Sequence, residues 1–139
     1  MFLKNSEKIR WLDIGSIEET LLEQYKNGAW PEEVPRDAVE VQLEWTASDG
    51  VGIQHFKVSS RFRGKGYGSS VLDSIINFVR ELNDANYLVI NMKTPKTERG
   101  RNFVKKFGFD IIEDYSNRQR ITARRNLGKM NNPEEKQEY

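Results

Sequence analysis

The sequence predicts a single domain of mixed α/β (α+β) class, with helices flanking a central sheet that is partly parallel. Two alternating segments are joined by a turn within residues 39–58, and two later segments repeat apolar residues at helical spacing. Between those helices, residues 87–92 form a continuous apolar run of strand length, which is typical of a strand covered on both faces. With 139 residues the chain has the length of one domain, which we expect to span residues 1–127.

The N-terminal part contains one predicted strand and one predicted helix. Residues 8–14 alternate in the manner of a strand. Ser16 and, three residues later, Glu19 match a capping box, which predicts a helix from Ile17 to Tyr25. Gly28 helps to end that helix, and the next segment, with two prolines, is an irregular connection.

The next elements are a hairpin and a crossover. Val39 to Trp45 alternates apolar and acidic or amide side chains, and the turn at 48–50 leads into a second strand from Val51 to Val58. Apolar residues three and four positions apart predict a helix over Gly68 to Leu82, before the strand at Tyr87 to Met92.

The C-terminal part adds a helix and a closing hairpin. The helix is predicted over Thr97 to Phe107, and the hairpin pairs Phe109 to Glu113 with Arg120 to Arg124. Asp114 to Gln119 form its loop. Residues 128–139 lack apolar periodicity, so we expect a disordered tail there.

Composition excludes several function classes. The chain has no cysteine and a single histidine, His55, which excludes disulfides, thiolate zinc sites and cysteine nucleophiles, and leaves little basis for a metal site. No apolar run approaches the ~20 residues that span a bilayer, and the N-terminus lacks a signal-peptide pattern. We therefore expect a soluble, cytoplasmic protein without a membrane partner.

The net charge of +1 conceals an uneven distribution along the chain. Residues 13–49 hold ten acidic and two basic residues, whereas residues 57–106 hold eleven basic and four acidic residues. These runs are either solvated faces or an acidic half that attracts a cation beside a basic half that attracts a polyanion.

A glycine-rich turn at residues 63–68 (RGKGYG) connects the second hairpin strand to the next helix. Three glycines within five residues indicate that the backbone approaches a ligand closely, or that the turn needs positive φ angles. The amides and dipole at the start of the helix, together with Arg63 and Lys65, favour an anion such as a phosphate or pyrophosphate. A Walker loop fails because Ser59 and Gly66 occupy its required positions, and a dinucleotide fingerprint fails at Ser69.

The spacing Arg63-x-x-Gly66-x-Gly68 resembles the R/Q-x-x-G-x-G/A motif of the GCN5-related N-acetyltransferase (GNAT) superfamily. The segment Lys106-Phe107-Gly108-Phe109 is similar to the end of the family's F-Y-x-K-x-G-F motif, and the likeness covers roughly residues 37–127. The resemblance implies a GNAT-like sheet that splays at a cofactor cleft. The N-terminal part carries no family motif and is abbreviated.

In that family, the pantetheine of acetyl-CoA lies between splayed strands and the glycine turn holds the pyrophosphate. The resemblance therefore implies acetyl-CoA as co-substrate and no metal. The cofactor-binding residues that it implies are Phe56, Lys57 and Val58 through their main chain, Arg63, the amides of Gly64, Lys65, Gly66, Tyr67, Gly68 and Ser69, and Thr97, which stands where the family often has an asparagine.

The family's usual acid and base are missing from this sequence. Val104 occupies the position of the tyrosine, and residues 52–54 (GIQ) occupy that of the carboxylate. Three substitutes are available: His55 as a base, Glu44 as a carboxylate on the polar face of the preceding strand, and Tyr115 in the closing loop as an acid.

The sequence leaves two functions in competition. One is an acetyl-CoA-dependent N-acetyltransferase acting on an amine, namely a protein lysine, an N-terminus or a small cationic amine, as the acidic segment suggests. The other is an inactive CoA-binding regulatory or interaction protein of the same fold. A nucleic-acid surface over the C-terminal arginines is disfavoured because few aromatic residues are interleaved there. Completion of the short N-terminal part by a second subunit, as a homodimer, stays open.

Overall fold

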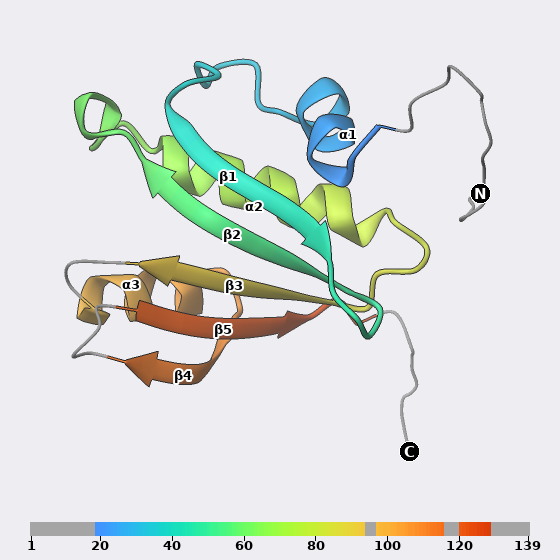
Figure 1. The fold of residues 1–139 in the computed structure, drawn as a ribbon. Coiled ribbons are helices and arrows are strands. Elements are labelled where there is room, and N and C mark those ends of the chain that lie inside the picture. Colours follow the sequence, from blue (N-terminus) through green and yellow to red (C-terminus); the bar gives the residue numbers. More distant parts are fainter. Residues whose placement is uncertain (1–18, 94–96, 116–119, 129–139) are drawn as a thin grey trace.

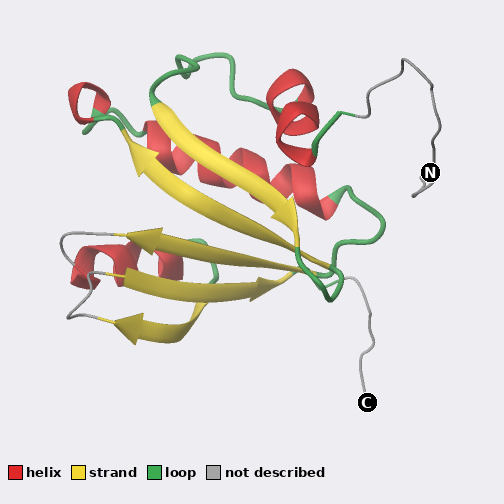
Figure 2. Cartoon of the chain, in the orientation of Figure 1, coloured by secondary structure: helices red, strands yellow, loops and turns green. Residues whose placement is uncertain are grey.

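The computed structural model describes residues 19–93, 97–115 and 120–128. These residues form a five-stranded sheet in the order β1-β2-β3-β5-β4, with helices packed against it (Figures 1 and 2). The elements are α1 (Leu21–Gly28), β1 (Val39–Trp45), β2 (Gly50–Val58), the short 3-10 helix η1 (Ser60–Phe62), α2 (Tyr67–Arg80), β3 (Tyr87–Lys93), α3 (Thr97–Lys106), β4 (Asp110–Tyr115) and β5 (Arg120–Asn126). The predicted mixed α/β class is confirmed.

The sheet is antiparallel except where β2 meets β3, and these two strands are parallel. A parallel pair needs a crossover connection, which α2 provides. The β2–β3 pairing is short and runs only from Gly50↔Tyr87 to Ile53↔Ile90, although β2 continues to Val58 and β3 to Lys93. Beyond Ile53 the two strands diverge (Figure 1).

Helices α2 and α3 lie on one side of this sheet, the rear side in Figure 2. The ring of Phe56 in β2 packs against Phe103 of α3 at a centroid distance of 5.9 Å, next to Gly68 of α2. α2 buries the side chains predicted by its helical spacing, Val71, Leu72, Ile75, Ile76 and Val79. No helix of the described residues covers the opposite side, which we call the front face.

Helix α1 is fixed to α2 through Tyr25. Its ring meets Phe78 edge-on at 5.5 Å, and its hydroxyl shares a hydrogen bond of 2.6 Å with Ser74 Oγ. Burial raises the pKa of Tyr25 to about 12, and the hydrogen bond to Ser74 opposes that rise only in part. This contact anchors the N-terminal helix on the core.

The predicted start of the first helix is wrong. The capping box is formed by Thr20 and Glu23: Glu23 N donates to Thr20 Oγ1 at 3.1 Å, and Thr20 N donates to Glu23 Oε1 at 2.9 Å. The helix therefore begins at Leu21, and Glu19 precedes it. The capping-box pattern occurs twice in this segment, as Ser16-x-x-Glu19 and as Thr20-x-x-Glu23. The second occurrence directly precedes Leu21, which is buried. Ser16 and the strand predicted over residues 8–14 lie outside the described residues.

The closing hairpin is longer than predicted. β4 continues through Tyr115 and β5 through Asn126, so Asp114 and Tyr115 belong to a strand and not to the loop. Residues 116–119 and 129–139, which include most of the predicted loop and tail, lie outside the described part of the chain. Among the described residues, no helix combines the length and the apolar character needed to cross a bilayer.

Candidate functional site

A β-bulge in β2 marks the point where the strands diverge. Gln42 pairs with Gln54 and Glu40 with Lys57, so Val41 alone faces both His55 and Phe56. His55 takes a φ of 56°, in the left-handed region. In regular alternation with buried Ile53, His55 would face the core. The extra residue instead leaves His55 exposed on the front face and turns Phe56 into the core.

The glycine turn prepares an anion site at the start of α2. Gly64 and Gly66 have φ angles of 81° and 80°, which glycine adopts without strain, so the interpretation of a turn that needs positive φ holds. Gly66 is the N-cap of α2, and no side chain caps its first turn. The amides of residues 67–69 are therefore available at the positive end of the helix dipole. Arg63 lies beside them, its Nε donating to Val58 O at 3.3 Å.

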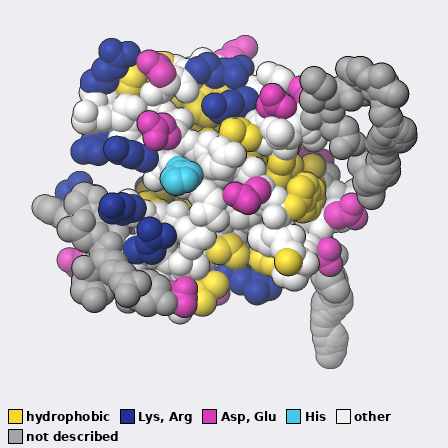
Figure 3. Space-filling view, viewed as in Figure 1, with side chains coloured by type: hydrophobic (Ala, Val, Ile, Leu, Met, Phe, Trp, Pro, Cys, Tyr) yellow, Lys and Arg dark blue, Asp and Glu magenta, His cyan; other side chains and the backbone are white. Residues whose placement is uncertain are grey.

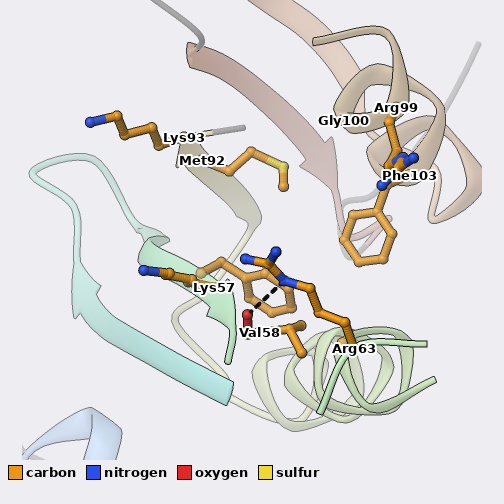
Figure 4. A pocket seen from close by; sticks show the side chains of 10 residues that line it. Lys57, Val58, Arg63, Met92, Lys93, Arg99, Gly100 and Phe103 are labelled. Carbon is orange, nitrogen blue, oxygen red and sulfur yellow. Dashed lines mark hydrogen bonds between the residues drawn. The ribbon is translucent and has the colours of Figure 1, made fainter. Parts of the chain in front are cut away.

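A cavity of about 340 Å³ fills the gap between the diverging strands and reaches this turn (Figure 4). Its apolar walls come from β2, β3 and α3. Gly68 keeps the wall open at α2, since a methyl group there would lie 3.0 Å from Val58 Cγ2. The lining residues are Phe56, Lys57, Val58, Arg63, Gly68, Met92, Lys93, Arg99, Gly100 and Phe103.

The cavity carries positive charge only. Lys57, Arg63, Lys93 and Arg99 line it, and no acidic residue does. Within the described part of the chain, none of these four forms an ion pair with an acid. An apolar gap with such cations at its rim is suited to a long, flexible ligand that ends in phosphates.

Nearly all of the predicted cofactor residues line the cavity or adjoin it directly. Five of them line it, namely Phe56, Lys57, Val58, Arg63 and Gly68. Five others form the adjoining turn and helix start, namely Gly64, Lys65, Gly66, Tyr67 and Ser69. Thr97 begins α3, and its side chain lies outside what the structure describes.

Sequence reasoning missed the contribution of β3 and α3. Met92 and Lys93 end the buried strand, and Arg99 and Phe103 stand four residues apart on α3. That spacing places Arg99 and Phe103 on one helix face, a signal that was available in the sequence. Which face meets the cavity depends on how α3 packs, and local spacing does not fix that.

The three candidate catalytic residues do not come together. Glu44 is exposed on β1 opposite Gly52, beside the paired part of β2, and Tyr115 ends β4 at the other edge of the sheet, with its side chain outside the described part. Only His55 lies where the strands diverge. Figure 3 shows this histidine at the inner end of a notch flanked by lysine and arginine side chains.

The position that the family's F-Y-x-K-x-G-F motif gives to a tyrosine is buried in this chain. Val104 is fully buried, so this position contributes packing and no proton donor. Among the described residues no group of three or more histidine and carboxylate side chains is arranged to hold a metal. His55 is exposed on the front face where the strands diverge, and it is not among the residues that line the cavity.

Comparisons with known proteins agree with this geometry. The family model described as "Acetyltransferase (GNAT) family" matches residues 20–109, whereas no curated protein matches the chain. Among solved structures, the chain is similar to Ard1 from Thermoplasma volcanium, with 24% identity, a TM-score of 0.53, and coverage of 64% of this chain and 62% of that one. It is also similar to a GNAT family acetyltransferase from Elizabethkingia anophelis with acetyl-CoA bound, with 18% identity, a TM-score of 0.52, and coverage of 64% and 68%.

At these identities the two structures show a common fold, and the chain spans about three fifths of the Ard1 structure's length. The family model, by contrast, covers well over half of this chain, including the glycine turn, the diverging strands and α3. The chain therefore belongs to the acetyltransferase (GNAT) family.

Proposed function

We propose that the protein is an N-acetyltransferase that uses acetyl-CoA to acetylate an amine. The observation that carries the proposal is the cavity between the diverging ends of β2 and β3, with an uncapped helix start and a glycine turn at one end. The acetyl-CoA bound in the Elizabethkingia structure of the same fold supports it. Bound acetyl-CoA would supply the activated acetyl thioester.

Each part of the cavity suits one part of that molecule. The amides of residues 64–69 and the guanidinium of Arg63 would hold the pyrophosphate. The main chain of β2 from Phe56 to Val58, which β3 leaves unpaired on that side, would bond the pantetheine amides. Phe56 and Phe103 would exclude water along the apolar part.

The chemical step needs a neutral amine and a leaving thiolate. His55, at the head of the gap, would accept the proton that the amine loses as its nitrogen bonds to the acetyl carbon and the carbon–sulfur bond breaks. Because Val104 removes the family's acid, the proton held by His55 would return through water to the leaving sulfur, and the cations that line the cavity would stabilise the negative charge there. Glu44 would act only through the field of its carboxylate, and a part for Tyr115 stays a prediction.

Release of free thiol from acetyl-CoA in the presence of a panel of amines tests the proposal. We expect amine-dependent release, and we expect Arg63→Gln to raise KM for acetyl-CoA about tenfold, since one charge-assisted contact contributes about 1.5 kcal/mol. Arg61→Gln is the matched control, because Arg61 is exposed and pairs with Asp37 at 3.2 Å, outside the cavity. Equal KM values for the two variants would contradict the assigned pyrophosphate site.

A second candidate is a CoA-binding protein without catalysis. The observation that favours it is the pair of departures at Val104 and Gly52, which leave the family's acid and base positions without a titratable group. Tight CoA binding without thiol release for any amine would support this alternative. The cytoplasmic location and the homodimer stay predictions.

A further inference from the structure

Three exposed cations lie on the front face, near the strand ends that border the gap. They are Lys57 of β2, Lys93 of β3 and Arg120 of β5. Lys93 and Arg120 are direct partners in the antiparallel β3–β5 register, and like charges in such positions destabilise a sheet. In the part of the chain that the structure describes, no acid forms an ion pair with any of the three. This arrangement costs stability unless an anion binds there.

Lys57 and Lys93 border the cavity assigned to the cofactor, whereas Arg120 is not among its lining residues. The bulge turns Lys57 to the front while Phe56 and Val58 face the rear, and Lys93 likewise points opposite to Met92 in the cavity wall. In Figure 4 the side chains of Lys57 and Lys93 extend in the same direction, away from Arg99 and Phe103. The charged ends of Lys57 and Lys93 therefore extend to the front face, while Arg63 and Arg99 are available to the phosphates of the donor.

The same face carries the opposite charge on β1. Glu40 and Glu44 are exposed there, opposite Lys57 and Gly52 in the register, and His55 lies between the acidic strand and the cations. Glu40 does not form an ion pair with Lys57, although the two are register partners. Figure 3 shows acidic side chains on either side of the histidine and basic side chains along the notch. The front face thus carries acidic side chains on β1 and basic side chains at the ends of β2, β3 and β5, with the candidate base among them.

We infer that the acceptor is an amine that also carries an anionic group, a carboxylate or a phosphate. Its nitrogen would approach His55 from the side of the β1 carboxylates, and its anion would bind between Lys57, Lys93 and Arg120. A purely cationic amine would be repelled by the three cations, whereas a zwitterion is attracted by both parts of the face. The inference rests on the proposed function, because it names the substrate class of that reaction.

Acceptors matched in pairs test the inference through thiol release at saturating acetyl-CoA. β-Alanine is compared with β-alaninamide, and O-phosphoethanolamine with ethanolamine. We expect kcat/KM to be at least about tenfold higher for the anionic member of one pair, and the preference to shrink as salt is raised, since exposed charges are screened. The pair with the larger ratio identifies the anion as carboxylate or phosphate.

Variants connect the preference to the three cations. Arg120→Gln should raise KM for the preferred acceptor about tenfold, reduce the preference and leave KM for acetyl-CoA within about twofold, because Arg120 does not line the cavity. Arg124→Gln is the matched control, because Arg124 lies on β5 opposite Val89, along the paired part of the sheet, and stacks on Tyr87 at 4.0 Å. Arg124→Gln should leave KM for the preferred acceptor and KM for acetyl-CoA unchanged.

Two outcomes would overturn the inference about the acceptor, and a third would also overturn the proposed function. Equal kcat/KM within both pairs, or a rise in KM for acetyl-CoA alone in Arg120→Gln, would show that the front cations do not bind the acceptor. Turnover of an amine that lacks the anionic group would, in either case, leave the proposed function intact. Absence of thiol release with every amine would overturn the proposed function as well, so the two failures are distinguishable.

Discussion

His55 adopts a backbone conformation that glycine and asparagine reach more easily than histidine. The bulge that requires this conformation also aims the side chain at the head of the gap between β2 and β3. A strained residue beside a cavity is typical of a position held for function and not for stability. Stability and activity should therefore respond to substitution at this residue in opposite directions.

His55→Gly and His55→Asn should keep or raise the free energy of unfolding, by up to about 1 kcal/mol, because both residues tolerate positive φ. The same variants should lower kcat about a hundredfold, the lower end of what a general base contributes. Urea unfolding and thiol release measure the two quantities. His55→Ala is the control, since it removes the imidazole but keeps the backbone strain. Unchanged kcat in all three variants would exclude His55 as the base.

Tyr25 makes stability depend on alkaline pH. Its pKa is raised by burial to about 12, so above pH 10 the unfolded chain loses the phenolic proton before the folded chain does. The contribution of this group to the free energy of unfolding should therefore be complete below pH 10 and should fall between pH 10 and 12, by about 2 kcal/mol. Urea unfolding at several pH values should show a shallower fall for Tyr25→Phe than for the wild type. Parallel curves for the two proteins would contradict the assignment.

At the scale of elements, the sequence predicts best the features that depend on local spacing. Helix α2, predicted over Gly68 to Leu82, spans Tyr67–Arg80, because its apolar positions three and four apart fix its buried face. The parallel β2–β3 pair was predictable from the strand–helix–strand order. The start of α1 was not predictable in this way, because two capping-box patterns lie four residues apart. Only the burial of Leu21 shows which of them caps the helix.

The bulge in β2 gave no sequence signal. A glycine or asparagine at position 55 would have indicated a positive φ, whereas histidine did not. Because the sequence did not reveal the bulge, it could not show which face of the sheet His55 and Lys57 occupy. It also could not show which cations lie on the front and which on the rear. Local sequence patterns therefore could not predict the part of the site that depends on this one extra residue.

The start of the β2–β3 pair depends on Gly50. A methyl group added there would overlap the ring of Tyr87, whose hydroxyl is hydrogen-bonded to Ser48 Oγ at 2.6 Å and Thr46 Oγ1 at 2.9 Å. Gly50→Ala should cost about 1 to 3 kcal/mol of unfolding free energy, as overpacked core positions do.

Thermal or urea unfolding checks this expectation, with Gly52→Ala as the matched control on the same strand. A methyl group at Gly52 would lie 3.5 Å from its nearest neighbour, an ordinary contact. We expect a change within about 0.5 kcal/mol there. Equal losses in Gly50→Ala and Gly52→Ala would show that the Tyr87 contact does not control this end of the sheet.

At the scale of the whole molecule, our proposals assign two kinds of binding to the two sides of the sheet. The rear side, with α2, α3, Arg63 and Arg99, forms the cavity assigned to the donor, and the front face presents His55. The basic run at residues 57–106 was open to two interpretations, a solvated face or a surface that attracts a polyanion, and the fold distributes its members between these two sides. The near-neutral net charge of +1 therefore conceals local charges on both sides of the sheet, to which our proposals assign different ligands.

The most direct test of the account is a calorimetric titration with CoA of the wild type and two alanine variants. Gly66→Ala forces an L side chain into a φ of 80° and displaces the amides of the turn, whereas Gly28→Ala adds a methyl group at a site with nothing within 4 Å and no positive φ. We predict saturable binding at one site, with Kd about tenfold weaker in Gly66→Ala, or about 1.4 kcal/mol, and unchanged in Gly28→Ala. No saturable binding to the wild type, or the same Kd in all three proteins, would contradict the account.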